Sequence, residues 1–180
     1  LTEMLRNNAS VEHVAGAGVL PANVRVNDKV FSENIMLVDP DFMRMFDFKV
    51  IAGNRTALDK KDQVLLTKEM AIKYFGNEQV VGEALSIKFN DKDKFDFTVG
   101  GVLEDTPANS SIYFDFMVSG AIWRDMNPMA HEDWSNFRGN VFVEKKQKAD
   151  WQSLDKTFAQ YQILQNQGNT SRPVKRVEVI

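Results

Sequence analysis

The sequence has 180 residues, of which 43% are hydrophobic and 26% are charged, and its formal net charge at pH 7 is −3. Such a composition is typical of a globular protein, and a chain of this length buries about 70% of its unfolded surface on folding. The slightly acidic charge excludes the basic surface that nucleic-acid binding requires, and the absence of cysteine excludes disulfides, thiolate chemistry and cysteine metal sites. No run approaches the roughly 20 apolar residues that cross a bilayer.

The first 62 residues are expected to form one helix and several short strands. Apolar residues between positions 1 and 14 suit one helical face, and the stretch 15–21, which contains two glycines, is interpreted as a transition. Residues 55–62 are polar with mixed charges, and this predicts an exposed loop. The other elements expected here are strands at 24–26 and 35–38, a helix after the turn at Asp39-Pro40, and a strand at 48–51.

The clearest local signals lie between residues 63 and 117. Thr67 is suited to cap a helix, and Gly76 supplies the left-handed residue that ends it. Hydrophobic residues then alternate on both sides of a polar turn at 90–94, which predicts a hairpin. Gly100-Gly101 interrupts the second strand of this hairpin and indicates a bulge or a close backbone approach.

The last third of the chain carries weaker signals. Trp123 and Trp134 lie in a stretch that is interpreted as a loop with a helical turn, and their indoles either are buried or form a contact patch for a partner. The elements expected are strands at 112–117 and 140–144, a helix from about 151 to 165 capped by Asp150, and a final strand at 174–179. Strands, hairpins and helices thus mix along the chain, which indicates an α+β fold.

No residue pattern typical of catalysis, metal binding or nucleotide binding occurs. His13 and His131 are far apart and neither lies in a ligand motif, and the carboxylate pair Glu104-Asp105 has no neighbour suited to acid/base work. Asn90 to Asp93 resembles the start of a calcium loop but lacks its glycine and its bidentate glutamate. The sequence has no Walker motif and no nucleophile elbow. We therefore expect a non-enzymatic protein with no metal and no cofactor.

Four segments carry a family resemblance as a set. They are V-D-P-D-F-M-R-M-F-D-F-K-V-I-A-G-N at 38–54, V-L-L-T-K-E-M-A-I-K-Y-F-G at 64–76, V-V-G-E-A-L-S-I at 80–87 and F-T-V-G-G-V-L-E-D-T-P-A-N-S at 97–110. Together they resemble the MacB-like periplasmic core domain, which is the extracytoplasmic part of FtsX-like ABC transporter permeases. Val81 stands where the family usually has proline, and Gly100 is an additional glycine.

The resemblance implies an α+β fold with two lobes. Residues 1–53 and 107–180 would form a porter-like βαβ lobe, and residues 54–106 would form a smaller, mostly-β lobe inserted into it. The turn clusters at Gly53-Asn54 and Thr106-Pro107 are where the chain would cross between them. A strand at 174–180 would pack in the first lobe, beside the strand at 140–144 and the last helix, so that both chain ends lie in one lobe.

The resemblance also implies a function and partners. Such a domain lies on the periplasmic face of a bacterial inner membrane and transmits ATP-driven motion for efflux, lipoprotein extraction or regulation of an envelope partner. Its partners would be a cytoplasmic ATP-binding subunit or domain, a second permease chain in a homodimer or heterodimer, and a periplasmic protein. The chain opens at Leu1 in mid-pattern, which is interpreted as the start of a domain excised from a longer protein, and the resemblance implies transmembrane helices on both sides of it. The alternative is a free-standing, non-enzymatic binding module of the cell envelope.

Overall fold

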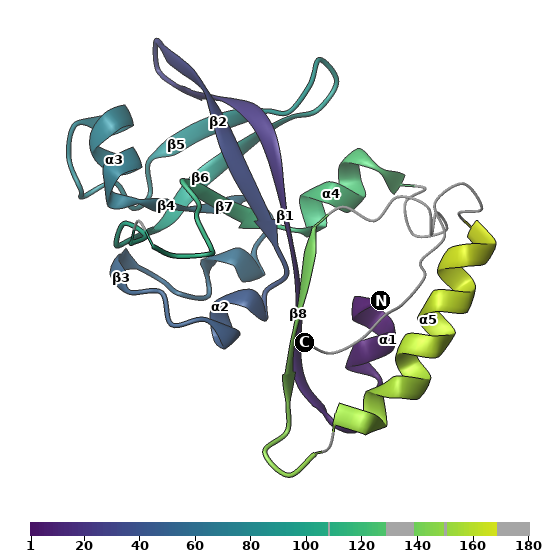
Figure 1. Ribbon diagram of the computed structural model, residues 1–180. Helices are drawn as coiled ribbons and strands as arrows, with labels where there is room; N and C mark the ends of the chain where they lie inside the picture. Colours follow the sequence, from purple (N-terminus) through teal and green to yellow (C-terminus); the bar gives the residue numbers. More distant parts are fainter. Residues whose placement is uncertain (108, 129–138, 150, 169–180) are drawn as a thin grey trace.

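The computed structural model describes residues 1–107, 109–128, 139–149 and 151–168. Its elements are α1 (Thr2–Arg6), β1 (Val11–Val26), β2 (Lys29–Val38), α2 (Phe42–Met45), β3 (Val50–Gly53), the 3₁₀ helix η1 (Ala57–Asp59), β4 (Gln63–Thr67), α3 (Lys68–Phe75), β5 (Ala84–Lys88), β6 (Lys94–Leu103), β7 (Phe116–Ser119), α4 (Ala121–Met126), β8 (Asn140–Lys145), the 3₁₀ helix η3 (Trp151–Leu154) and α5 (Asp155–Gly168) (Figure 1). The predicted α+β fold is confirmed.

Six strands pair in a cycle that closes on itself. β1 pairs antiparallel with β2, β2 pairs parallel with β7, and β7 pairs antiparallel with β4. β4 then pairs parallel with β6, β6 antiparallel with β5, and β5 antiparallel with β1. β3 adds to β6 outside this ring, and β8 adds to the N-terminal half of β1. The ring therefore encloses an interior, and each of its strands turns one face towards that interior.

The interior of the ring holds a hydrophobic cluster, which we call the inner cluster. Alternate residues of each strand contribute to it, because successive side chains of a strand point to opposite faces. The helices α3 and α4 add Met70, Tyr74 and Ile122. The strand residues of the inner cluster are Ala22, Val24, Val26, Ile35, Leu37, Val64, Leu66, Leu85, Ile87, Phe97, Val99, Val102, Phe116 and Val118.

The local signals between residues 63 and 103 are confirmed. The Thr67 hydroxyl accepts a hydrogen bond from the Met70 N–H at 3.4 Å, and Gly76 ends α3 with φ of 81°. β5 and β6 form the expected hairpin. In the pairing of β6 with β4 the register shifts at Gly100, and this extra residue returns Val102 to the inner face.

A second hydrophobic cluster, the outer cluster, lies where α2 and η1 cover the outside of the ring. Phe42 and Leu58 are 0% and 1% exposed at its centre. Phenylalanine rings continue from there: the centroids of Phe42 and Phe46 are 4.7 Å apart, those of Phe46 and Phe48 6.0 Å, and those of Phe48 and Phe114 5.1 Å. The outer cluster fixes α2 and the following loop against the ring.

Residues 55–62 form the expected exposed loop only in part. Thr56 and residues 59–62 are exposed, but Ala57 and Leu58 are buried in η1. The Arg55 guanidinium donates three hydrogen bonds to main-chain carbonyls of α2 and of the loop that follows it. The three acceptors are the carbonyl oxygens of Met43, Phe46 and Phe48. The polar composition of this segment did not indicate these contacts. Arg55 bonds to main-chain carbonyls of another segment, and the polarity of its own neighbours carries no information about such bonds.

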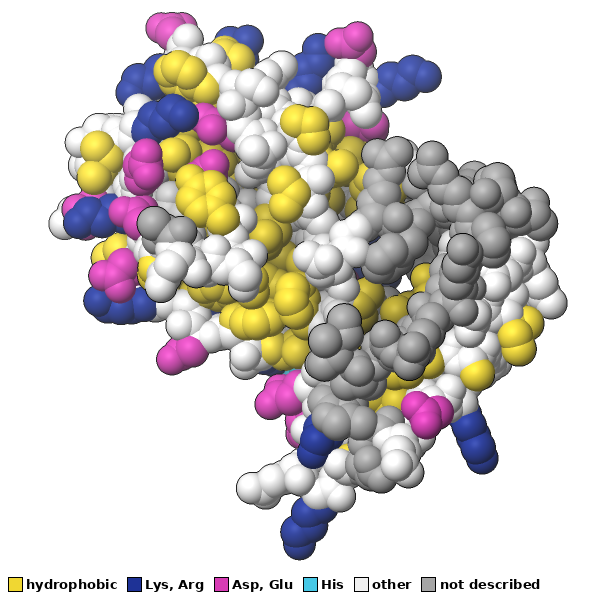
Figure 2. Space-filling model, viewed as in Figure 1, with side chains coloured by type: hydrophobic (Ala, Val, Ile, Leu, Met, Phe, Trp, Pro, Cys, Tyr) yellow, Lys and Arg dark blue, Asp and Glu magenta, His cyan; other side chains and the backbone are white. Residues whose placement is uncertain are grey.

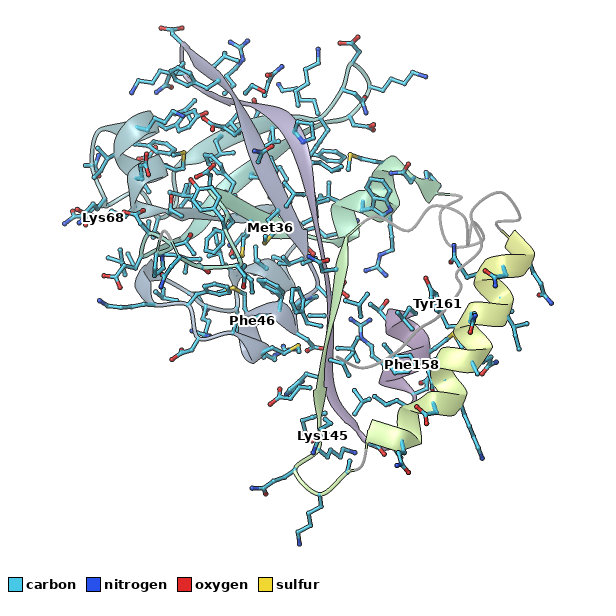
Figure 3. The ribbon with its side chains drawn as sticks, viewed as in Figure 1. Met36, Phe46, Lys68, Lys145, Phe158 and Tyr161 are labelled. Carbon is cyan, nitrogen blue, oxygen red and sulfur yellow. The ribbon has the colours of Figure 1, made fainter. Side chains whose placement is uncertain are left out.

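A third hydrophobic cluster joins the first and the last segments that the structure describes. It contains Leu5, Val11, Val14 and Leu154, with Phe158 packed against it. Figure 1 shows α1 and α5 on the same side of β1 and β8, away from the ring. In Figure 3, Phe158 and Tyr161 lie on the side of α5 that faces α1. We call α1, residues 11–17 of β1, β8, η3 and α5 the terminal part, and the ring with β3, α2, α3 and α4 the central body.

The predictions of a helix over residues 1–14 and of a transition at 15–21 are wrong. α1 is a single short helix, and β1 begins at Val11 and runs without a break to Val26. The alternation that marks a strand is hidden in this stretch for two reasons. The register of β1 against β8 shifts between Val11 and His13, and the two halves of β1 face different hydrophobic clusters.

Several element boundaries also differ from those expected. β2 begins at Lys29 rather than near residue 35, β7 begins only at Phe116, and α5 extends to Gly168. Before β7, the Ser110 hydroxyl bonds to both the N–H and the C=O of Ile112, and this local turn replaces the start of the expected strand. The expected cap Asp150 and the expected strand at 174–179 lie outside the described residues.

The division of the chain into two lobes stays a prediction. The described sheet includes strands from residues 1–53, 54–106 and 107–180. Both described segments that flank residues 54–106 contribute to the inner cluster together with that segment.

The Tyr74 side chain links α3 to β2 through a partly buried carboxylate. Its hydroxyl donates to Oε1 of Glu33 at 2.7 Å, and the same oxygen lies 2.7 Å from Nζ of Lys73. The ring of Phe31 meets the Tyr74 ring edge-on, with centroids 5.6 Å apart. Burial, and then the hydrogen bond to Glu33, raise the pKa of Tyr74 above its ordinary value.

Replacing Tyr74 with phenylalanine should lower the free energy of unfolding by about 1–2 kcal/mol at pH 7, because Glu33 loses a donor. Because the native pKa of Tyr74 is raised, wild-type stability should fall as the pH rises above the unfolded value of about 10. The variant lacks this contribution, so the stability gap between the two proteins should narrow by about 1 kcal/mol per pH unit there. Urea unfolding of both proteins at neutral and alkaline pH measures the gap, and a constant gap would contradict the assignment.

Candidate functional site: the junction of the chain ends with the central body

The strand β1 connects the terminal part to the central body. It has 16 residues and is ~53 Å long at the usual rise of a strand. Its N-terminal residues pair with β8, and its residues from 17 onward pair with β2. Ala17 pairs with Asn140 of β8 and also with Val38 of β2, so these two strands lie on opposite edges of β1. The strand therefore changes its partner and its edge at Ala17. Figure 1 shows β8 and β2 beside different stretches of β1.

The backbone is closely packed at this exchange. Gly139, which precedes β8, has φ of +120°, and a Cβ atom there would lie 2.3 Å from the Ala17 carbonyl oxygen. On the other edge, a Cβ atom on Gly16 would lie 3.3 Å from Oδ2 of Asp39. Only glycine allows the approach of residue 139, because both its φ and the available space exclude a side chain.

Asp39 joins three segments at the end of β2. Its Oδ2 atom accepts hydrogen bonds from Nη2 of Arg6 at 2.9 Å and from the Gly16 N–H at 3.0 Å. Its own N–H donates to the Gly16 carbonyl at 3.0 Å. Arg6 also donates to the Val14 carbonyl at 3.3 Å. We call Arg6, Gly16 and Asp39 the Asp39 cluster; it continues the β1–β2 contact beyond the last paired residues and ties α1 to it.

Further charged residues lie at and around α2, close in sequence to Asp39. Asp41 pairs with Nη1 of Arg44 at 2.6 Å, and its carboxylate lies 3.9 Å from Nδ1 of His13. Arg44 also lies 3.6 Å from Asp59. The side chain of Arg44 is 50% exposed, so its pairs contribute little stability. Within this group, the approach of His13 to Asp41 brings the terminal part and the central body together.

An aromatic contact joins the two parts through β8. Phe142 meets Phe46 edge-on with ring centroids 5.0 Å apart, and it meets Phe42 at 5.7 Å. A shallow hollow of about 370 Å³ lies beside it, lined by Met45, Phe46, Phe142, Val143 and Glu144. Phe46 lies between α2 and β8 in Figure 3. Figure 2 shows apolar side chains gathered over α2 and the neighbouring part of the central body.

The chemistry of the described residues does not suggest a reaction centre. No group of three or more histidine or acidic side chains among them is arranged to hold a metal ion. The resolved pKa shifts arise from burial or from simple pairs, as where Asp115 raises the pKa of Tyr113 and Lys88 lowers that of Asp91. None of the described helices has the length and apolar character needed to span a bilayer.

The tryptophans proposed as a contact patch are only partly described. Trp123 lies on α4, is half-buried, and packs against the inner cluster. Trp134 lies outside the described residues, so the contact patch stays a prediction. The sequence identified Asp39-Pro40 as a turn and placed Gly16 in a transition, but it gave no sign that Asp39 and Gly16 bind each other, since 23 positions separate them.

A second hollow lies on the central body, and none of its lining residues belongs to the Asp39 cluster. It has a volume of about 740 Å³ and is bordered by β3 and by the end of α3. Ile51 and Ile72 are 40% and 47% exposed at its lining. It is lined by Ile51, Ala52, Ile72, Gly76, Asn77, Glu78 and Gln79.

Comparisons with known proteins agree on one kind of domain. The family model of the MacB-like periplasmic core domain matches residues 1–161. A domain assigned to a permease protein from Porphyromonas gingivalis has a TM-score of 0.69 and 27% identity, covering 91% of this chain and 68% of that one. The periplasmic region of MacB from Actinobacillus actinomycetemcomitans has a TM-score of 0.64 and 16% identity, with 92% and 71% coverage. The extracellular domain of the noncanonic ABC-type transporter YknZ from Gram-positive bacteria has the same score and identity, with 95% and 83% coverage. No curated protein matches the sequence significantly.

Proposed function

We propose that this chain, which belongs to the family of MacB-like periplasmic core domains, transmits ATP-driven movement of an ABC transporter permease to a partner outside the membrane. In this role it is tethered at the periplasmic face of a bacterial inner membrane by transmembrane helices. It works in a permease dimer with a cytoplasmic ATP-binding subunit or domain. The process served is efflux, lipoprotein extraction or regulation of an envelope partner.

The observation that carries the proposal is the course of β1. Both described chain ends belong to the terminal part, where α1 and α5 share one hydrophobic cluster. A single strand of 16 residues leads from that part into the ring. Movement applied at the chain ends therefore reaches the central body through a hydrogen-bonded element rather than through a loop.

The rival function is a free-standing binding module of the cell envelope. Such a module needs no tether, so the two functions differ in what flanks the 180 residues in the gene. Apolar spans of about 20 residues on both sides favour the permease. Flanks without such spans would remove the permease function and leave the binding module.

The test of transmission uses the full-length permease with its ATPase in lipid nanodiscs. Ser32 is an exposed residue of β2 and the 180 residues of the sequence contain no cysteine, so Ser32→Cys gives one spin label per protomer in this domain. We expect the distance between the two labels to change when ATP is added, and to stay constant with an ATPase that binds no ATP. An unchanged distance in a permease that hydrolyses ATP normally would argue against transmission.

The isolated chain should be monomeric at micromolar concentration. Its large exposed apolar side chains in the described ranges are scattered over separate elements, and a stable interface needs about 1,000 Å² of buried surface or more. Examples are Val19, Phe31, Ile51, Ile72 and Ile163. Sedimentation velocity would measure this, and a tight dimer would show that the domain supplies its own dimer interface.

A further inference from the structure

We propose that the Asp39 cluster is a releasable latch, and that its opening lets the terminal part pivot on the central body at Ala17 of β1. The pivot is a property of the isolated chain. Its use in transport rests on the proposed function, because it determines how movement at the chain ends reaches the central body.

The position of the pivot follows from the strand pairings. Residues 11–17 of β1 pair with β8 on one edge, and residues 17–26 pair with β2 on the other. Only Ala17 is paired on both edges by these two strands. No other described strand runs through both parts, and the inner cluster and the third cluster each lie within one part. The outer cluster spans the junction, because it includes Ala15 of β1 and is contacted by Phe142 of β8. A rotation at Ala17 can therefore keep both ladders and the inner and third clusters intact, and it shifts Ala15 and Phe142 against the outer cluster.

The latch lies on the edge of β1 that β2 leaves uncovered. Beyond Val38 the ladder ends, and Asp39 holds Gly16 through its main-chain N–H and through its carboxylate. Arg6 binds the same Oδ2 atom from α1. One carboxylate oxygen of the central body thus holds both the helix and the strand of the terminal part.

The chemistry of the Arg6–Asp39 contact suits release. The side chains of Arg6 and Asp39 are 42% and 20% exposed, so water reaches the pair. Ion pairs with such access are weak, because solvent screens them and competes for their hydrogen bonds. The pair can therefore open under a modest force, which a fully buried ion pair would resist.

The contact on the β8 side also permits movement. Phe142 meets Phe42 and Phe46 through ring faces and edges, without directional hydrogen bonds. The hollow of about 370 Å³ beside these rings offers space into which Phe142 can move. The junction is thus held by the Arg6–Asp39 ion pair on the β2 side, whereas on the β8 side Phe142 can slide over the rings that it contacts.

The experiment measures the pivot in the isolated chain. Spin labels at Ser32→Cys on β2 and Lys156→Cys on α5, both exposed positions, report the distance between the two parts. Arg6→Gln and Asp39→Asn remove the charge of either partner. We expect both variants to broaden the distance distribution or to shift its mean by several ångströms. Amide exchange at Gly16, whose N–H donates to Asp39, should also become at least several-fold faster, while exchange at the amides that pair β1 with β8 should stay unchanged.

The matched control is Lys61→Gln. It removes the ion pair of Lys61 with Asp125 of α4, which is of similar exposure but involves no residue of the terminal part, so the distance distribution should stay that of the wild type. Distributions for folded Arg6→Gln and Asp39→Asn that equal the wild-type one would overturn the pivot. Because Arg6→Gln leaves the bonds between Asp39 and Gly16 in place, it decides the matter if Asp39→Asn does not fold. An ATP-dependent change in the full-length permease without a pivot would leave the proposed function standing.

Discussion

Replacing Phe97 with alanine is expected to lower the free energy of unfolding by about 3–5 kcal/mol. Phe97 is 3% exposed, lies on β6 directly opposite Leu85 of β5, and belongs to the inner cluster. The loss in free energy of unfolding should be as large as that of other substitutions that leave a large cavity, because the six-stranded ring around Phe97 is closed by strand pairing on all sides. Its backbone therefore cannot move inward to fill the space that the lost side chain leaves.

Urea unfolding followed by tryptophan fluorescence gives the measurement. The control is Thr98→Ala, the next residue of β6, whose side chain is exposed on the outer face. It should change the free energy of unfolding by no more than about 0.5 kcal/mol. A loss below about 1 kcal/mol for Phe97→Ala would mean that this face of the hairpin does not point into a tightly packed interior.

Replacing Arg55 with alanine is expected to cost about 2–4 kcal/mol, even though its side chain is 35% exposed. Its guanidinium donates to three main-chain carbonyls, and bonds from a charged donor are stronger than neutral ones. Without it, the carbonyls of Met43 and Phe48 lose a donor in a partly buried loop, whereas that of Phe46 still accepts from the Phe48 N–H. That loop carries Phe46 and Phe48 of the aromatic chain, so the outer cluster should loosen with it.

Two variants test this explanation of Arg55. Arg55→Lys keeps the charge but cannot span three acceptors with one ammonium group, so its loss should be intermediate. Arg44→Ala removes an arginine that is 50% exposed and bound only to carboxylates, and it should cost less than about 1 kcal/mol. Equal losses in free energy of unfolding for Arg44→Ala and Arg55→Ala would show that the three bonds from Arg55 to carbonyls do not stabilise the fold more than exposed ion pairs do.

Little of the junction could be predicted from the sequence. Asp39 was recognised as a turn residue, but its bond to Gly16 and its pair with Arg6 join positions 23 and 33 residues away. Phe142 was assigned correctly to a strand, whereas its contact with Phe46 crosses almost a hundred residues. Such contacts leave no periodic mark, because each depends on one side chain from each segment.

The sequence by itself determined the stretch from β4 to β6, because its signals are local. The Thr67 cap, the left-handed Gly76 and the alternation on both sides of the turn at 90–94 each act within a few residues, and together they also carry the family resemblance. Only the tertiary structure decided that the residues of β1 form a strand and not a helix. Its residues satisfy a weak helical pattern as well as a strand, and what makes them a strand is pairing with β2, β5 and β8. The partners in β5 and β8 lie from about sixty to more than a hundred residues away, and hydrogen bonds to segments so distant outweigh local preference.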